Sequence, residues 1–166
     1  MNTHKSSIQF PHPSGLWRII VRFPILLYRF KLGWLFGKRA LLLEHRGRKS
    51  GIIRRAVIEV VNLDVQKGSY IVAAAWGNES DWYKNIQAEP RVNIGVGTTR
   101  FPASAKMLSA GDAAQHLNAY AIRHPFAFRH LVSRLIGSKS HDTDQIIKSL
   151  TEAIPFVEFV PAGDCV

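Results

Sequence analysis

Residues Glu44 to Arg55 read EHRGRKSGIIRR and join two apolar, strand-like runs. Five cations and two glycines fall within these twelve residues. Gly47 and Gly51 allow the backbone to adopt positive φ or to approach a ligand closely. The cations supply the charge that an anion needs. The stretch therefore predicts a hairpin whose turn binds a phosphate group, with a solvated basic hairpin as the alternative.

The chain on either side of this turn shows strand patterns, with helical segments inserted between some of them. We expect strands at residues 40–45, 54–62, 69–75, 92–96, 100–108 and 156–160. Helices are expected at 81–88, with Asp81 as N-cap, at 109–137 with a break at Pro125, and at 146–153. Mostly strands with a few helices favour an α+β, mainly β fold, in which a small antiparallel barrel carries peripheral helices.

Positive charge is concentrated in the first third of the chain. The 166 residues carry a net charge of +10, and residues 1–55 hold twelve of the 22 Lys and Arg but a single acid, Glu44. This asymmetry favours an anionic partner. We divide the chain into a basic arm and amphipathic helical segment at 1–36 and a cofactor-binding barrel domain at 37–166.

The amphipathic segment at residues 16–36 has three candidate roles. It packs on the domain, lies at an anionic membrane surface, or contacts a partner protein. Four cations interrupt its apolar residues, which excludes a membrane-spanning helix. The single cysteine, Cys165, and the absence of an apolar leader predict a cytoplasmic protein, with a peripheral position at the inner membrane face if the segment binds lipid.

Several kinds of site are excluded by spacing. The turn has neither the P-loop pattern nor the dinucleotide-binding pattern of glycines. The histidines show no metal-ligand spacing, so no metal is expected. No Ser/His/Asp or Cys/His set stands out. Glu59, within an apolar strand, is expected on the outward face.

Two further segments could border a ligand. The sequence Trp76-Gly77-Asn78 follows an apolar strand, where an aromatic residue and a glycine can flank a planar group, although core packing of Trp76 is the simpler interpretation. Asn85 lies on the helix expected at 81–88 and could reach a ligand or cap a loop, while Trp82 and Ile86 share the face of that helix expected in the core.

Together these segments resemble the deazaflavin-dependent nitroreductase family, whose split β-barrel is similar to that of flavin-dependent pyridoxamine-phosphate oxidases. The resemblance covers about residues 30–160. The matching elements, in chain order, are Gly47-Arg48-Lys49-Ser50-Gly51 with Arg54, then Tyr70-Ile-Val-Ala-Ala-Ala before a glycine-containing loop, then Trp82-Tyr83-Lys84-Asn85-Ile86 with Ala88 and Pro90.

The resemblance implies coenzyme F420, a deazaflavin with a phosphate and an oligoglutamate tail, and hydride transfer to a nitro compound, a quinone or a conjugated alkene. It assigns the phosphate and tail to the turn residues Gly47, Arg48, Lys49, Ser50, Gly51, Arg54 and Arg55. It places Ala75, Trp76, Gly77 and Asn78 beside the ring and Asn85 near the cofactor.

The chain departs from the family at two places. Some members have Ser-Lys-Gly-Gly where this chain has Ala75-Trp76-Gly77-Asn78, so a hydroxyl and a cation are missing there. Substrate-lining tyrosines of some members are replaced near His124, Phe126 and His130. These changes bear on the substrate more than on the cofactor.

Alternatives stay open at this point. One is a barrel of the same kind that binds FMN, because one phosphate would suffice for the turn. Another is a non-catalytic module on anionic lipid or nucleic acid, although no nucleic-acid-binding motif is present. The catalytic residues are not assigned, and His124 and Tyr120 are weak candidates for the proton donor. We expect a small hydrophobic electrophile as substrate and note that such barrels often form homodimers.

Overall fold

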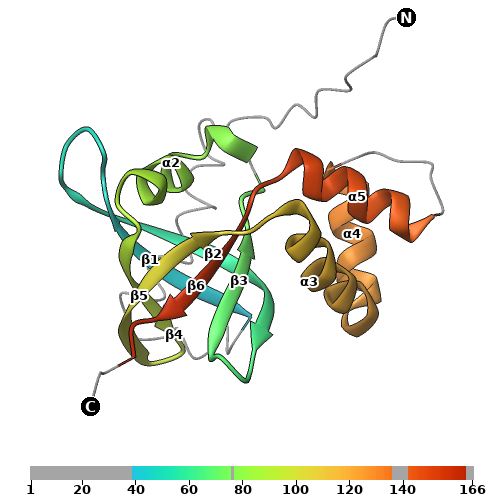
Figure 1. The fold of residues 1–166 in the computed structure, drawn as a ribbon, viewed down its shortest axis with the longest axis horizontal. Coiled ribbons are helices and arrows are strands. Elements are labelled where there is room, and N and C mark those ends of the chain that lie inside the picture. Colours follow the sequence, from blue (N-terminus) through green and yellow to red (C-terminus); the bar gives the residue numbers. More distant parts are fainter. Residues whose placement is uncertain (1–38, 76, 136–141, 164–166) are drawn as a thin grey trace, which may run out of the picture.

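The computed structural model describes residues 39–75, 77–135 and 142–163. In this part of the chain six strands close an antiparallel barrel in the order β1-β2-β3-β6-β5-β4 (Figure 1). The strands are β1 (Ala40–Arg46), β2 (Ile53–Asp64), β3 (Ser69–Ala73), β4 (Arg91–Val96), β5 (Thr99–Met107) and β6 (Phe156–Pro161). The expected mainly β barrel with peripheral helices is therefore confirmed.

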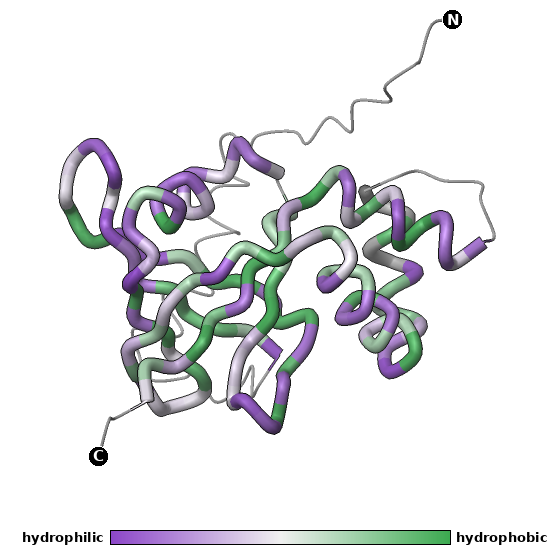
Figure 2. Tube along the Cα trace, in the orientation of Figure 1, coloured by the Kyte–Doolittle hydropathy of each residue, from purple (hydrophilic) through white to green (hydrophobic). Residues whose placement is uncertain are grey.

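Alternation along the strands fills the barrel interior. In β1, Leu41 and Leu43 are buried in the central cluster, and Ile58 and Val60 of β2 lie on the same inward side. Figure 2 shows this pattern as mainly hydrophobic strands, whereas the loop that joins β1 to β2 is largely hydrophilic. Because side chains alternate with a period of two, the residues between these positions face outward. Glu59 is one of them and is exposed, as expected.

Three helices pack together on one side of the barrel (Figure 1). They are α3 (Ala110–Arg123), α4 (Pro125–Leu135) and α5 (Thr143–Ala153). A second buried cluster joins them to the outer face of the sheet through Ile71 and Phe156. The expected break at Pro125 is confirmed, since α3 ends at Arg123 and α4 begins with the proline, which a first helical position tolerates.

The short helix α2 (Asp81–Ala88) closes one end of the barrel, next to the turn between β1 and β2 (Figure 1). Tyr83 and Ile86 are buried in the central cluster, and Trp82 packs against it, which confirms the expected core face. The expected N-cap at Asp81 is wrong. Ser80 is the N-cap residue, and its side chain makes no capping hydrogen bond. The preceding loop contains a short 3-10 helix, η2 (Gly77–Glu79).

Within the described ranges no helix is both long and apolar enough to cross a membrane. The amphipathic segment at 16–36 and the side chain of Trp76 lie outside the described residues, so the expectations placed on them remain predictions.

Candidate functional site

The turn between β1 and β2 is held closed by its own backbone. Gly47 N–H donates to Ile52 O at 2.9 Å, and Gly51 N–H donates to Gly47 O at 2.7 Å. Gly51 has φ +66°, a conformation that side-chain-bearing residues rarely adopt. A Cβ at Gly47 would lie 2.8 Å from Ser50 Oγ. Gly51 is therefore favoured by the backbone of the turn and Gly47 by close packing against Ser50, and the turn presents Arg48 and Lys49 at its exposed tip.

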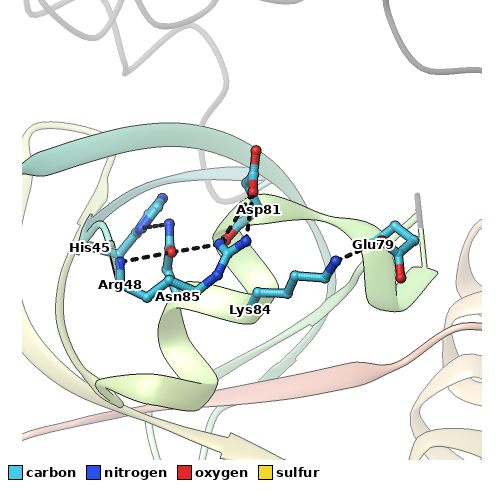
Figure 3. A network of polar contacts seen from close by, with 6 residues as sticks. All are labelled: His45, Arg48, Glu79, Asp81, Lys84 and Asn85. Atoms are coloured by element: carbon cyan, nitrogen blue, oxygen red, sulfur yellow. Dashed lines mark hydrogen bonds and ion pairs between the residues drawn. The ribbon is translucent and has the colours of Figure 1, made fainter. Parts of the chain in front are cut away.

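Helix α2 fixes the side chain of Arg48 (Figure 3). Asn85 Oδ1 accepts from the backbone N–H of Arg48 at 3.0 Å and from its Nη1 at 2.9 Å. Asp81 Oδ1 accepts from Nη1 and Nη2 of the same guanidinium, both at 3.2 Å. Since the side chain of Asp81 is 87% exposed and that of Arg48 is 27% exposed, this ion pair is open to water and to competing anions.

His45 lies beneath this arrangement and was missed by the sequence analysis. It continues the inward series Leu41, Leu43 and is 4% exposed. Asn85 Nδ2 lies 3.2 Å from His45 Nδ1. Burial lowers the pKa of His45 below its ordinary 6.5, and the charge of Arg54 across the hairpin adds to this effect, while a hydrogen bond with the backbone of Arg46 and the charge of Asp81 oppose it. A histidine at an inward strand position was a signal that alternation alone could have detected.

The structure divides the predicted cations between two faces of the hairpin. Arg54 is paired with His45 in the strand register and shares its face. Arg55 is paired with Glu44 on the other face, where its Nε donates to Glu44 Oε1 at 2.6 Å. Arg100 joins the same carboxylate at 3.4 Å. Arg48 and Arg54 therefore lie together at the α2 end, and Arg55 does not.

The loop from Ala75 to Ser80 leads into α2 beside this site. Gly77 is buried with φ +64°, and Asn78 is exposed. Ser80 Oγ is buried and lacks a hydrogen-bond partner among the described residues. A buried hydroxyl without a partner is uncommon, and a bound ligand is one way to satisfy it.

The two candidate proton donors lie elsewhere. Tyr120 O–H donates to Glu59 Oε1 at 3.1 Å, where α3 meets β2. Glu59 is five residues beyond Arg54 along β2, which corresponds to about 17 Å of strand. Burial and then Glu59 raise the pKa of Tyr120 to about 12. His124 is exposed, and its ring is tilted relative to that of Tyr120, with the two ring centroids 5.3 Å apart. The hydrogen bonds around Arg48 include neither residue, and their catalytic role stays a prediction.

The residues at the α2 end fit the anionic part of a deazaflavin cofactor. A guanidinium offers planar, bidentate donors to phosphate or carboxylate, and a lysine adds a compact charge. Arg48 and Lys49 provide these groups on the exposed turn, and Arg54 adds a guanidinium near the start of β2. Among the described residues no cluster of three or more His, Cys, Asp or Glu could hold a metal.

Comparison with known proteins connects these features to one family. The model of the family described as F420H(2)-dependent quinone reductase matches residues 29–133. A curated Mycobacterium tuberculosis protein, Rv3178, described as a candidate F420H(2)-dependent quinone reductase, is 34% identical over 77 residues. That match covers 45% of this chain and 63% of the relative, so the chain spans less than two thirds of the relative's length.

Solved structures support the fold. An F420-H2 dependent reductase (FDR-A) superposes with a TM-score of 0.51 at 19% identity, over 74% of this chain and 95% of that chain. The conserved hypothetical protein Rv2991 of Mycobacterium tuberculosis gives a TM-score of 0.51 at 13% identity, over 98% of this chain and 87% of that chain. At these identities the likeness speaks for the shared barrel alone.

Proposed function

The chain belongs to the F420H(2)-dependent quinone reductase family, and from this premise we propose that it is an oxidoreductase that transfers hydride from F420H2 to a quinone. When bound, the deazaflavin supplies the hydride, and the protein supplies binding, orientation and electrostatics. The FMN alternative and the non-catalytic module are thereby set aside in favour of F420. Nitro compounds and conjugated alkenes remain the alternative acceptors.

The observation that carries this proposal is the anchored Arg48 on the cationic turn. Its guanidinium is held in place by Asn85 and paired with the exposed carboxylate of Asp81, and Arg54 adds a second guanidinium on the face of the hairpin that it shares with His45. We assign the phosphate and glutamate tail to Arg48, Lys49 and Arg54. Arg55, whose charge is already paired with Glu44, contributes less than the sequence predicted.

The rest of the site orients the ring and limits its contact with water. We assign the ring to the loop Ala75–Asn78, where Gly77 has φ +64° and Asn78 is exposed. Tyr83 and Ile86 of α2 fill the adjacent barrel end and exclude solvent from below. A dry site strengthens the polar contacts that hold the ring and acceptor together.

Water is the proton donor that these residues favour. A phenol whose pKa is raised to about 12 is a weaker acid than a free tyrosine, and the Tyr120 proton is already donated to Glu59. Tyr120 and His124 stay candidates from sequence that single substitutions can test. Ala75-Trp76 stands where some family members have Ser-Lys, and the missing hydroxyl and cation favour an apolar acceptor such as a quinone over a nitro compound.

The acceptor preference can be measured directly. F420H2 is mixed with the full-length protein and one acceptor at a time: a quinone, a nitroaromatic compound or a conjugated enone. The rise in oxidised deazaflavin absorbance gives kcat/KM, and we expect the quinone to exceed the others by about tenfold or more. A nitroaromatic preference would overturn the quinone assignment. Activity with reduced FMN but none with F420H2 would overturn the cofactor.

Two partner predictions belong with this function. We propose that residues 16–36 contact an anionic membrane surface, from which a lipid-soluble quinone would arrive, and that the chain forms a homodimer. Flotation with anionic vesicles, with and without residues 1–36, tests the first. Sedimentation equilibrium tests the second. Equal flotation of both proteins, or a monomer at all concentrations, would contradict them.

A further inference from the structure

Asn85 is a buried amide whose oxygen and nitrogen both contact residues of the site. It is 5% exposed and points from α2 towards the turn (Figure 3). Its Oδ1 accepts two hydrogen bonds from Arg48, one from the backbone and one from the guanidinium. With Oδ1 occupied by Arg48 and little of the side chain exposed, the geometry does not favour a direct cofactor contact by the Asn85 side chain.

The donors on Oδ1 determine the orientation of the amide. Because two N–H groups of Arg48 approach one atom, that atom must be the carbonyl oxygen, and the amide nitrogen must face His45. Nδ2 then donates to His45 Nδ1 at 3.2 Å, which leaves Nδ1 without a proton and places the imidazole proton on Nε2. A neutral histidine that accepts at Nδ1 thus supports the same amide orientation that the two donors of Arg48 require.

We propose that Asn85 is a positioning residue for the anionic tail of the cofactor, which holds Arg48 in its binding position and is itself oriented by His45. This inference rests on the proposed function, because it requires Arg48 to be a ligand of the tail. In this proposal His45 of β1, Asn85 of α2 and Arg48 of the turn form a hydrogen-bonded relay, and only Arg48 touches the cofactor.

Protonation of His45 would break the relay. A proton on Nδ1 turns that atom from acceptor to donor, so the amide must rotate and present Oδ1 to the imidazolium. Nδ2 would then face the two donor groups of Arg48, and both hydrogen bonds would be lost. The charged groups that face His45 are Arg54 from β2 and Asp81 from α2, with Arg48 beyond the amide. The tail contribution to affinity should therefore fall in mild acid.

The test separates tail binding from ring binding. Dissociation constants of the full-length protein are measured by deazaflavin fluorescence for intact F420 and for the same deazaflavin without phosphate and glutamates. The ratio of the two dissociation constants reports the contribution of the tail alone, because any effect of pH on the ring, which both ligands share, cancels. The ratio is measured from about pH 5 to 8 for the wild type, Asn85→Ala, His45→Leu and His45→Asn. His45→Asn keeps an acceptor near the position of Nδ1 but cannot titrate.

We expect Asn85→Ala to reduce the tail contribution by about tenfold or more at neutral pH, because it removes hydrogen bonds to a charged group, and by less in acid, where the wild type has lost the same bonds. His45→Leu should reduce it less. The wild-type contribution should fall below pH 6.5, the ordinary histidine pKa, whereas His45→Asn should stay level and near the wild-type maximum. An unchanged ratio in Asn85→Ala, or equal losses for both ligands, would overturn the relay.

Two further observations keep the inference separate from the proposed function. If the wild type binds both ligands equally, the tail site itself fails. If the wild-type ratio is large but insensitive to Asn85 and His45, only the relay fails. Should Asn85→Ala not fold, the histidine ¹⁵N spectrum of the wild type still decides, since the relay requires an unprotonated Nδ1 at His45. Asn85→Asp, which cannot donate, should move the proton to Nδ1, and an unchanged spectrum would contradict the relay.

Discussion

Arg48 and Asn85 are 37 positions apart in the chain, and one oxygen of the asparagine accepts from both the backbone and the guanidinium of the arginine. The pair joins a surface turn to the helix that closes the barrel. A long side chain on an exposed turn would ordinarily sample many rotamers, and a ligand that fixes one of them incurs an entropic cost. Here much of that ordering is present before a ligand arrives, which favours binding of an anion.

Turn geometry can be tested with two matched glycines. Gly51 and Gly68 have φ of +66° and +64°, and neither position would crowd a Cβ closely. Each glycine-to-alanine substitution should lower the free energy of unfolding by about 1 kcal/mol, because both positions need a left-handed backbone. Gly51→Ala should also weaken F420 binding, whereas Gly68→Ala should not. Equal F420 affinities of the two variants would show that the shape of the turn does not matter.

Asp81 competes with the cofactor for Arg48. Asp81→Asn removes a carboxylate 3.2 Å from the guanidinium, and we expect F420 affinity to rise. The rise should be about twofold to fivefold, the size of an exposed ion pair, and should shrink in high salt. Asp64→Asn is the control, because it removes the same charge near Lys67 in the turn after β2. A lower affinity in Asp81→Asn would mean that Asp81 positions Arg48 instead of competing for it.

The stability of the protein should depend on His45 in mild acid. Burial and Arg54 lower the folded-state pKa of His45 below 6.5, so the unfolded chain takes up this proton first as pH falls. The free energy of unfolding should therefore decline below pH 6.5, and His45→Asn should reduce that decline. Urea denaturation at a series of pH values measures it. Parallel pH profiles of the two proteins would exclude His45 as a source of the dependence.

Tyr120 is expected to act as a structural contact between α3 and β2. Tyr120→Phe removes the hydrogen bond to Glu59 and should cost about 0.5–1.5 kcal/mol of stability, with turnover nearly unchanged. The folded-state pKa of about 12 lies above the ordinary 10, so the wild type should lose stability as pH rises from 10 towards 12. The phenylalanine variant should lack that loss. A tenfold lower turnover, on the order of 1.4 kcal/mol, would instead place Tyr120 in proton transfer.

Local patterns accounted for most of the fold. Apolar runs rich in Val and Ile identified the strands, and proline marked a helix boundary at Pro125, where α3 gives way to α4. The error at Asp81 shows the limit of such signals. Serine and aspartate are both good N-cap residues, and their order in Ser80-Asp81 does not determine which one caps the start of the helix. The site was less accessible, since its central contact joins Arg48 to a helix far along the chain.

The sequence nonetheless contained signals for the faces on which Arg54, Arg55 and His45 lie. Adjacent strand residues point to opposite faces, so Arg54 and Arg55 could not both have faced the same ligand. The same rule puts His45 on the inward face with Leu41 and Leu43. What alternation could not supply is the position of α2 over the barrel end, which depends on packing of Ile86 and Tyr83 and brings Asn85 to both residues.

The central claim is that the α2 face of the turn holds the anionic tail of F420. Arg48→Ala and Arg55→Ala remove equal charge from the same hairpin, but only Arg48 lies on that face. Titrating both variants with F420 should show a loss of about tenfold or more for Arg48→Ala, the size expected for hydrogen bonds to a charged group, and a much smaller loss for Arg55→Ala. Equal losses, or a larger loss in Arg55→Ala, would contradict the account.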